Sequence, residues 1–157
     1  MDMSRSGNTF LLLREMAIVS DLARRSLRRV LPEGLGEAQF EVLNHLVFTG
    51  NREETPSDLA RLFEITRPAM TQTLGRMRAA GLVELVPAPA DGRLRHVRLT
   101  ATGRARHAEV LAALEQDAER LGARLGAGEL EALLGQVRRF RLEAEAVLGF
   151  AREAVQA

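Results

Sequence analysis

The chain has 157 residues, a net charge of +1 and 46% hydrophobic residues, which suits one compact domain or a domain with an oligomerisation element. It contains no cysteine and only 4% aromatic residues, which excludes a disulfide framework, a thiolate metal site and a cysteine redox switch, and disfavours base stacking as a binding mode. The sequence shows no secretion signal and no apolar run of bilayer length, so we expect a cytoplasmic protein without membrane association.

Two helices are predicted in the first third of the chain. The first begins near Asn8 or Thr9 and ends at the Pro-Glu-Gly sequence of residues 32–34, which breaks a helix. Its apolar stripe contains Met16, Ala23, Leu27 and Val30. The second helix runs from Gly36 to about Thr49 and is expected to bury Phe40, Leu43, Leu46 and Val47.

The next two predicted helices are short and closely spaced. Thr55-Pro56-Ser57-Asp58 resembles a capping box with proline in the first turn. Thr66 is the expected N-cap of the following helix, which Gly81 closes. Two short helices joined this tightly form a helix-turn-helix.

The helix after Thr66 has two different sides. At 100° per residue, one side is apolar and contains Met70, Thr73, Leu74 and Met77. The opposite side is small, polar and cationic, and the helix contains no acid. Small side chains on this side let the backbone approach a surface closely, while Thr, Gln and Arg can reach base edges and phosphates. We therefore predict a DNA-recognition helix.

A β-hairpin is predicted directly after this helix. Residues 82–86 resemble a strand, residues 87–92 are rich in turn formers, and residues 94–99 alternate apolar side chains with Arg95 and Arg98. A hairpin in this place is the wing of a winged helix.

Two long helices are predicted to complete the chain. One is capped at Thr100 and has a seam of Leu111, Leu114, Ala118, Leu121 and Leu125, and the other begins near Ala127. The seam of the last helix contains Leu133, Val137, Phe140, Ala144 and Val147. These seams exceed what a small winged helix needs for its own core, so a second copy of the chain is the simplest partner.

The predicted fold class is therefore mainly α with a small β-hairpin. We expect a winged helix-turn-helix DNA-binding domain at residues 35–103 and a helical dimerisation region at residues 8–34 and 104–157.

Charge is unevenly distributed along the chain. Residues 61–106 contain nine arginines and three acids, a net charge of +6, whereas the segment from residue 108 onward contains six arginines and nine acids, a net charge of −3. A polyanion-binding unit on a neutral scaffold would show this pattern. Chance clustering of solvated arginines is the alternative, and charge alone does not separate the two.

Several motifs in order resemble the MarR family of winged-helix transcriptional regulators over nearly the whole chain. They comprise residues 35–43, 58–60, 66–71, 81–83 and, most specifically, Asp91-Gly92-Arg93 followed by residues 97–103. The resemblance implies a homodimer whose first and last helices form the dimer domain. It also implies a protein that represses or activates promoters and often responds to a small ligand. We expect a repressor that binds palindromic duplex DNA and is released by a small-molecule effector, with an activator as the alternative.

The resemblance also implies which residues contact DNA. In the family, the arginine of the wing's Asp-x-Arg enters the minor groove while the aspartate orients it, and Arg93 and Asp91 occupy these positions, with Arg95 beside them. The recognition-helix positions that match are Thr66, Arg67, Pro68, Ala69, Thr71, Gln72 and Arg76. Many members carry arginine at the position of Gln72, so the base preference is expected to lean towards adenine. Glu64 places an acid in the preceding turn and is expected to weaken binding.

The sequence offers little for other kinds of site. His45 lies on the side of its helix away from Phe40 and is a candidate to line a ligand pocket, against the simpler interpretation as a surface or interface histidine. The three histidines are scattered without acidic neighbours at ligand spacing, so no metal and no cofactor is expected. No arrangement typical of an enzyme occurs. The alternative function is a winged-helix protein-interaction module without specific DNA binding.

Overall fold

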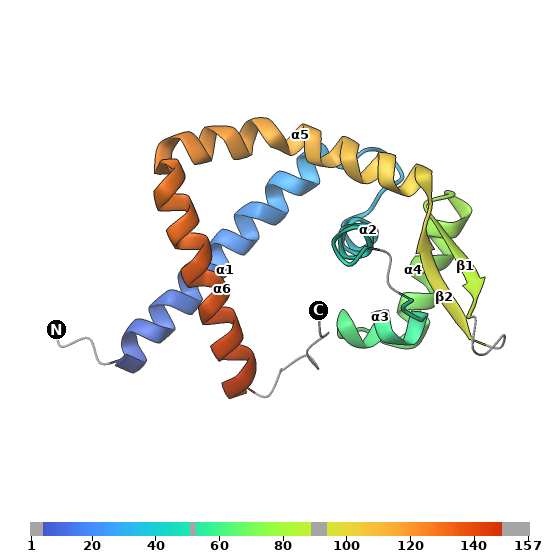
Figure 1. Cartoon of the computed structure of the whole chain (residues 1–157), viewed down its shortest axis with the longest axis horizontal. Helices are drawn as coiled ribbons and strands as arrows, with labels where there is room; N and C mark the ends of the chain where they lie inside the picture. The colour runs from blue at the N-terminus through green and yellow to red at the C-terminus, as the bar shows by residue number, and fades with distance from the viewer. Residues whose placement is uncertain (1–4, 51–52, 89–93, 149–157) are drawn as a thin grey trace.

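The computed structural model describes residues 5–50, 53–88 and 94–148. Its helices and strands follow the order predicted from the sequence, and the fold class, mainly helical with one small hairpin, is confirmed (Figure 1). The elements are α1 (Arg5–Val30), α2 (Glu37–Phe48), α3 (Pro56–Leu62), α4 (Arg67–Ala79), β1 (Val83–Pro87), β2 (Arg95–Leu99), α5 (Ala101–Leu125) and α6 (Ala127–Leu148).

The observed boundaries differ from the predicted ones by a few residues. α1 is already helical at Arg5, the first described residue, whereas we predicted a start near Asn8. Extending a formed helix through weak helix formers costs far less than nucleating one. α2 lies between Gly36 and Thr49, which are its caps. Gly36 has no side chain to cap the helix, but its N–H donates to Gln39 Oε1 at 2.7 Å. β1 and β2 each begin one residue later than predicted.

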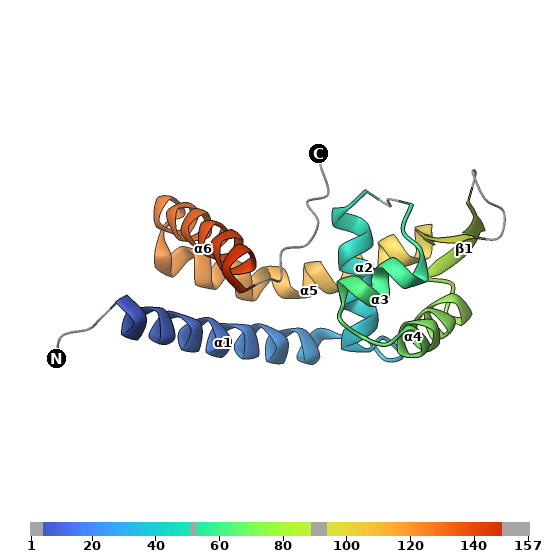
Figure 2. The ribbon, with the colours of Figure 1, turned by 90° about the horizontal axis from the view of Figure 1, so that it is seen from below.

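The molecule consists of a winged lobe and three outer helices. α2, α3, α4 and the hairpin gather at one end, and α5 runs from this lobe across to α6 at the other end (Figure 1). α1 also leaves the lobe in the direction of α6. α1 and α6 overlap in Figure 1 but are separated in the perpendicular view of Figure 2.

The hydrophobic core lies inside the winged lobe. Phe40, Leu43 and Leu46 of α2 are buried as predicted, and Val47 packs against them with part of its surface exposed. Leu27 of α1 and Val110 of α5 also belong to this core, so it extends beyond the predicted boundaries of residues 35–103. Of the predicted α1 stripe only Leu27 is buried.

The hairpin is attached to the rest of the lobe by a third extended segment. β1 and β2 are antiparallel, with Val83 opposite Leu99 and Pro87 opposite Arg95. Val97 N donates to the backbone oxygen of Glu54 at 2.8 Å, so the chain two residues before α3 pairs with the edge of β2 that faces away from β1. This pairing holds the base of the wing against the helix-turn-helix.

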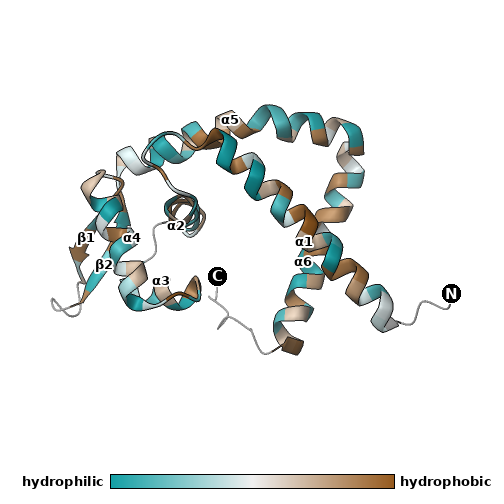
Figure 3. Ribbon diagram, turned by 180° about the vertical axis from the view of Figure 1, so that it is seen from behind, coloured by the Kyte–Doolittle hydropathy of each residue, from teal (hydrophilic) through white to brown (hydrophobic). Residues whose placement is uncertain are grey.

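The outer helices leave much of their apolar surface uncovered. α6 contains no buried residue, and Phe10 and Val19 of α1 are 72% and 63% exposed. Apolar segments are visible along both helices in Figure 3. Within the described ranges, none of the helices has the length and apolarity to cross a membrane.

Gly103 lies in the first turn of α5, against Leu82, which follows the end of α4. A Cβ placed there would overlap the carbonyl oxygen of Leu82 and lie 2.7 Å from Leu99 Cδ1. We therefore expect Gly103→Ala to lower the free energy of unfolding by roughly 1–3 kcal/mol, the usual cost of forcing a methyl group into packed structure. Urea unfolding followed by circular dichroism measures this.

Gly75→Ala is the matched control, since a Cβ at Gly75 would have no neighbour within 4 Å. Alanine is the better helix former by up to about 1 kcal/mol, so this variant should be slightly stabilised. Equal stability of the two variants would contradict the close approach of α5 to Leu82.

His107 joins α5 to α2 inside the core. Its ring is stacked on Phe40 with centroids 5.5 Å apart, and its Nε2 donates to Asn44 Oδ1 at 2.9 Å. Burial lowers the pKa of His107 below its ordinary 6.5, because desolvation disfavours the charged imidazolium.

This shift makes the stability depend on pH. Below about pH 6.5 the unfolded chain binds a proton at His107 that the folded chain does not, so the free energy of unfolding should fall as the pH is lowered. His107→Gln retains a donor for Asn44 and cannot titrate, so its stability should change less between pH 7.5 and pH 5.5. His45 and His96 are present in both proteins, so the difference between the two pH profiles reports on His107. Parallel pH profiles for wild type and variant would refute the assignment.

Candidate nucleic-acid interface

The sequence around α4 determines which of its sides is exposed. Thr66 caps the helix, its Oγ1 accepting from Ala69 N at 3.3 Å, and a proline lies in the first turn. Met70 and Met77 are 1% and 0% exposed, and Thr73 and Leu74 are buried beside them. The opposite side, called here the outer face, is exposed and consists of Arg67, Pro68, Thr71, Gln72, Gly75 and Arg76.

All seven residues predicted at the recognition helix are exposed: Thr66, Arg67, Pro68, Ala69, Thr71, Gln72 and Arg76. The structure thus brings them together on α4 and its N-cap, with the core behind them.

α3 begins with the capping box that the sequence predicted. Thr55 N and Oγ1 donate to Asp58 Oδ2 at 2.9 and 2.7 Å, and Asp58 N donates back to Thr55 Oγ1 at 3.2 Å. Burial by itself would raise the pKa of Asp58, but these hydrogen bonds and the guanidinium of Arg61 lower it below its ordinary value. The carboxylate is therefore held in its charged form, which fixes the first turn of α3.

The turn between α3 and α4 contains a strained residue. Glu64 has a φ of +52°, in the left-handed region that non-glycine residues seldom adopt. Ile65 N donates to the backbone oxygen of Ala60 at 3.0 Å and closes the turn. Glu64 is exposed two residues before the cap of α4, so the predicted acid is at the edge of the outer face.

The arginine side chains of α4 have no acidic partner among the described residues. Within the described part of the chain, the guanidinium groups of Arg67, Arg76 and Arg78 make no hydrogen bond and no ion pair. By contrast, Arg29 of α1 pairs with Asp117 at 2.7 Å and Arg28 with Glu37 at 2.9 Å. A guanidinium without an internal partner is available for a phosphate or a base edge.

The wing is only partly covered by the described residues. Arg95 is exposed at the start of β2, opposite Pro87. Asp91 and Arg93, the other two residues predicted to contact DNA here, lie outside the described residues.

His45 lies against Glu54 and Phe63. Its Nε2 lies 2.9 and 2.8 Å from the two carboxylate oxygens of Glu54, and its ring meets the edge of Phe63 at 5.8 Å. It does not line the cavity described next. Among the described residues, no cluster of His, Asp and Glu side chains could hold a metal ion.

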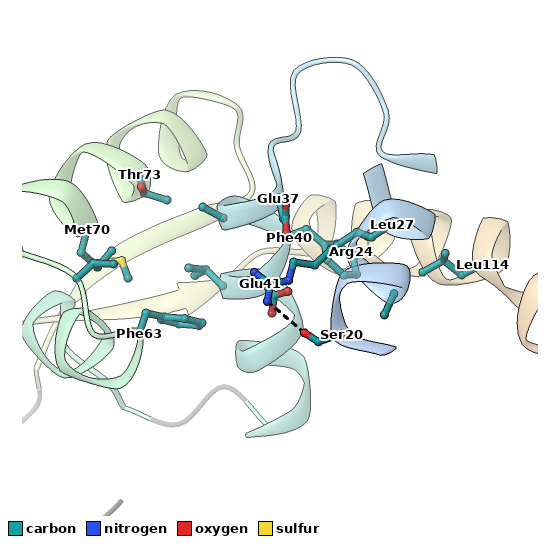
Figure 4. A pocket seen from close by; sticks show the side chains of 14 residues that line it. Ser20, Arg24, Leu27, Glu37, Phe40, Glu41, Phe63, Met70, Thr73 and Leu114 are labelled. Carbon is teal, nitrogen blue, oxygen red and sulfur yellow. Dashed lines mark hydrogen bonds between the residues drawn. The ribbon is translucent and has the colours of Figure 1, made fainter. Parts of the chain in front are cut away.

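A cavity of about 780 Å³ separates α1 from the inner side of α4 (Figure 4). Arg24 extends into it and donates to Ser20 Oγ at 3.1 Å. Sequence reasoning missed this cavity, because its walls come from segments far apart in the chain and no local pattern marks it. The lining residues are Ser20, Ala23, Arg24, Leu27, Glu37, Ala38, Phe40, Glu41, Val42, Phe63, Ile65, Met70, Thr73 and Leu114.

Comparisons with known proteins agree with this arrangement. The sequence model of the MarR family matches residues 33–94. The structure of the transcriptional regulator PA4135 is similar at 30% identity and a TM-score of 0.64, over 85% of this chain and 94% of that one. A cysteine-to-serine mutant of MarR from E. coli, in complex with operator DNA, is similar at 27% identity and a TM-score of 0.66, over 87% and 98% of the two chains.

The chain belongs to the MarR family. It is a transcriptional regulator and not an enzyme, as the motifs predicted. The regulator Tm0710 from Thermotoga maritima shares the fold at 23% identity and a TM-score of 0.64, over 90% of this chain and 98% of that one. No curated protein matches the chain.

The MarR family model and the structural likenesses cover different parts of the molecule. The matched residues 33–94 contain α2, α3, α4 and β1. The likeness to E. coli MarR extends over 87% of the chain, so it also includes the greater part of the outer helices.

Proposed function

We propose that this MarR-family regulator binds palindromic duplex DNA as a homodimer and reads the major groove with α4. The outer face of α4 carries the proposal, because it is acid-free, its arginine side chains pair with none of the described residues, and the inner side of the helix is fixed in the core. The likeness to E. coli MarR in complex with operator DNA supports it.

The outer face contains two kinds of side chain suited to different parts of DNA. Thr71 and Gln72 can reach base edges, where Gln pairs well with adenine. Arg67 and Arg76 suit phosphates, which position the protein without carrying sequence information. We further propose that Arg93, oriented by Asp91, enters the minor groove beside Arg95, where a narrow groove attracts cations.

The dimer in this proposal is built from α1 and α6. Leu133, Val137 and Val147 on α6 are 46%, 37% and 81% exposed, and exposed apolar surface of this extent marks an interface. Phe140 and Ala144, the other two residues of the predicted seam, are partly buried. Two recognition helices in a two-fold dimer would meet half-sites about one turn, ~10 bp, apart.

We also propose that the protein acts as a repressor released by a small molecule. The cavity has α1 on one side and Met70 and Thr73 of α4 on the other, so an occupant would contact the back of the recognition helix. Structures of E. coli MarR exist in reduced and oxidised forms, but this chain has no cysteine and any effector must act without a thiol.

The function is tested by selecting binding sites from a randomised duplex library with the purified protein. A palindromic consensus, bound more tightly than random duplex and with an affinity that falls as salt rises, supports the proposal. Binding without sequence preference, or no binding, would favour the alternative of a protein-interaction module.

Gln72→Ala should relax the preference at one base pair of each half-site by roughly 1–3 kcal/mol, because a bidentate contact to a base edge is lost. Competition titrations with single-base operator variants measure the change. Gln116→Ala removes an exposed glutamine from α5 and is the matched control. If Gln72→Ala discriminates all variants as the wild type does, Gln72 does not read a base.

Val137→Glu should dissociate the dimer, since it would bury an unpaired carboxylate in the interface at a cost of roughly 3–5 kcal/mol. Analytical ultracentrifugation at micromolar concentration measures the mass. Arg138→Glu introduces the same residue at an exposed position of α6 about 100° away around the helix and should leave the mass unchanged. A monomeric wild type would refute the dimer itself.

A further inference from the structure

One hydroxyl group joins the end of α4 to the start of α5. Thr100 Oγ1 lies 2.6 Å from the backbone oxygen of Gly81 and 3.0 Å from that of Leu82, and can donate to either. The same oxygen accepts from Gly103 N at 3.0 Å, in the first turn of α5. The N–H of Thr100 also donates to the Leu82 oxygen at 3.2 Å.

The partners of Thr100 belong to a rigid helix end. Leu82 N donates to the Met77 oxygen at 2.9 Å, and Gly81 N donates to the Arg78 oxygen at 3.0 Å. This pair of bonds is a Schellman motif, which Gly81 permits with its φ of +70°. The carbonyls that Thr100 contacts therefore move with the recognition helix.

The other side of this joint is equally rigid. α5 begins at Ala101, immediately after Thr100, and extends out of the winged lobe to α6 (Figure 1). At Gly103 the absent side chain lets α5 rest directly on Leu82. The end of α4 and the start of α5 thus meet directly over a few residues, and the Thr100 hydroxyl bonds to both sides of this contact.

We propose that Thr100 is a positioning residue for DNA recognition. Its hydroxyl fixes the angle between the recognition helix and α5, and through α5 it sets how the two recognition helices of a dimer are spaced. This proposal rests on the proposed function. Capping of α5 requires only an acceptor at residue 100, whereas the bond to Gly81 or Leu82 requires a donor, so the two roles of the side chain can be separated.

Three variants separate these roles. Thr100→Ser keeps both the acceptor and the donor. Thr100→Asp keeps a good N-cap acceptor but has no proton to donate. Thr100→Val has the shape of threonine but can neither accept nor donate a hydrogen bond. If the valine variant folds poorly, Thr100→Asp still removes the donor on its own.

The first measurement is the affinity for the selected operator and for random duplex, with half-site spacers lengthened and shortened by one base pair. Thr100→Asp and Thr100→Val should lose operator affinity by roughly three- to tenfold more than random-duplex affinity, the worth of one hydrogen bond, and should tolerate altered spacers better than the wild type. Thr100→Ser should match the wild type. The added charge of aspartate alone would weaken both duplexes alike, so an unchanged operator-to-random ratio in both variants overturns the proposal.

The second measurement uses no DNA. Because the chain has no cysteine, spin labels can be placed uniquely at Ala79→Cys on α4 and Glu119→Cys on α5, both exposed positions, in chains diluted with unlabelled protein. Pulsed dipolar spectroscopy should give a broader distance distribution for Thr100→Asp and Thr100→Val than for wild type and Thr100→Ser. Distance distributions of equal width in all four proteins would overturn the proposal that Thr100 fixes the angle between α4 and α5. A broader distance distribution in these two variants, combined with a wild type that binds all duplex sequences equally, would refute the proposed function but not the role of Thr100 in fixing the angle between α4 and α5.

Discussion

Burial of the inner side of α4 is the constraint on which the rest of the structure depends. Met70, Leu74 and Met77 are at most 3% exposed, and removing side chains of this size from a packed core costs several kcal/mol each. The helix therefore cannot rotate about its axis without exposing them. Its period of 3.6 residues then leaves no choice about which side chains face outward, so the core determines the surface that this MarR-family regulator presents.

Local signals in the sequence were sufficient for the elements around this helix. The caps at Thr55, Thr66 and Thr100 are each formed by a side chain and a backbone N–H three residues later, an interaction that depends on neighbouring residues alone. Contacts between distant segments could not be predicted in this way. His107 meets Asn44 across 63 positions, and His45 of α2 meets Glu54 in the segment between α2 and α3. No spacing or periodicity links such pairs, and the cavity, which α1 and α4 enclose together, is hidden from sequence for the same reason.

The outer helices show a different balance of forces. Inside the winged lobe α2 buries five residues, whereas the 22 residues of α6 bury none. Helix propensity alone rarely stabilises a helix in water, and most helical stability comes from packing of an apolar side. The sequence predicted the seam from its 3-4 spacing, but one chain by itself leaves that seam uncovered. A second copy that supplies the missing surface would account for both the pattern and its exposure.

The positions of the cavity and of the Thr100 joint suggest how a ligand could act on DNA recognition. Met70 and Thr73, which line the cavity, lie in the first turn and at the middle of α4. Thr100 contacts the residues that follow the C-terminal end of this helix. A ligand in the cavity would therefore push on the part of α4 that lies away from the Thr100 contact. If the helix pivots about the Thr100 contact, the displacement of each residue of α4 grows with its distance from that contact. Thr71 and Gln72 lie beside the cavity residues, so the side chains proposed to read bases would move more than those near Ala79. If the proposed function holds, a stiff joint would favour discrimination between operators, and the cavity lies beside the part of the helix whose displacement would disturb that discrimination most.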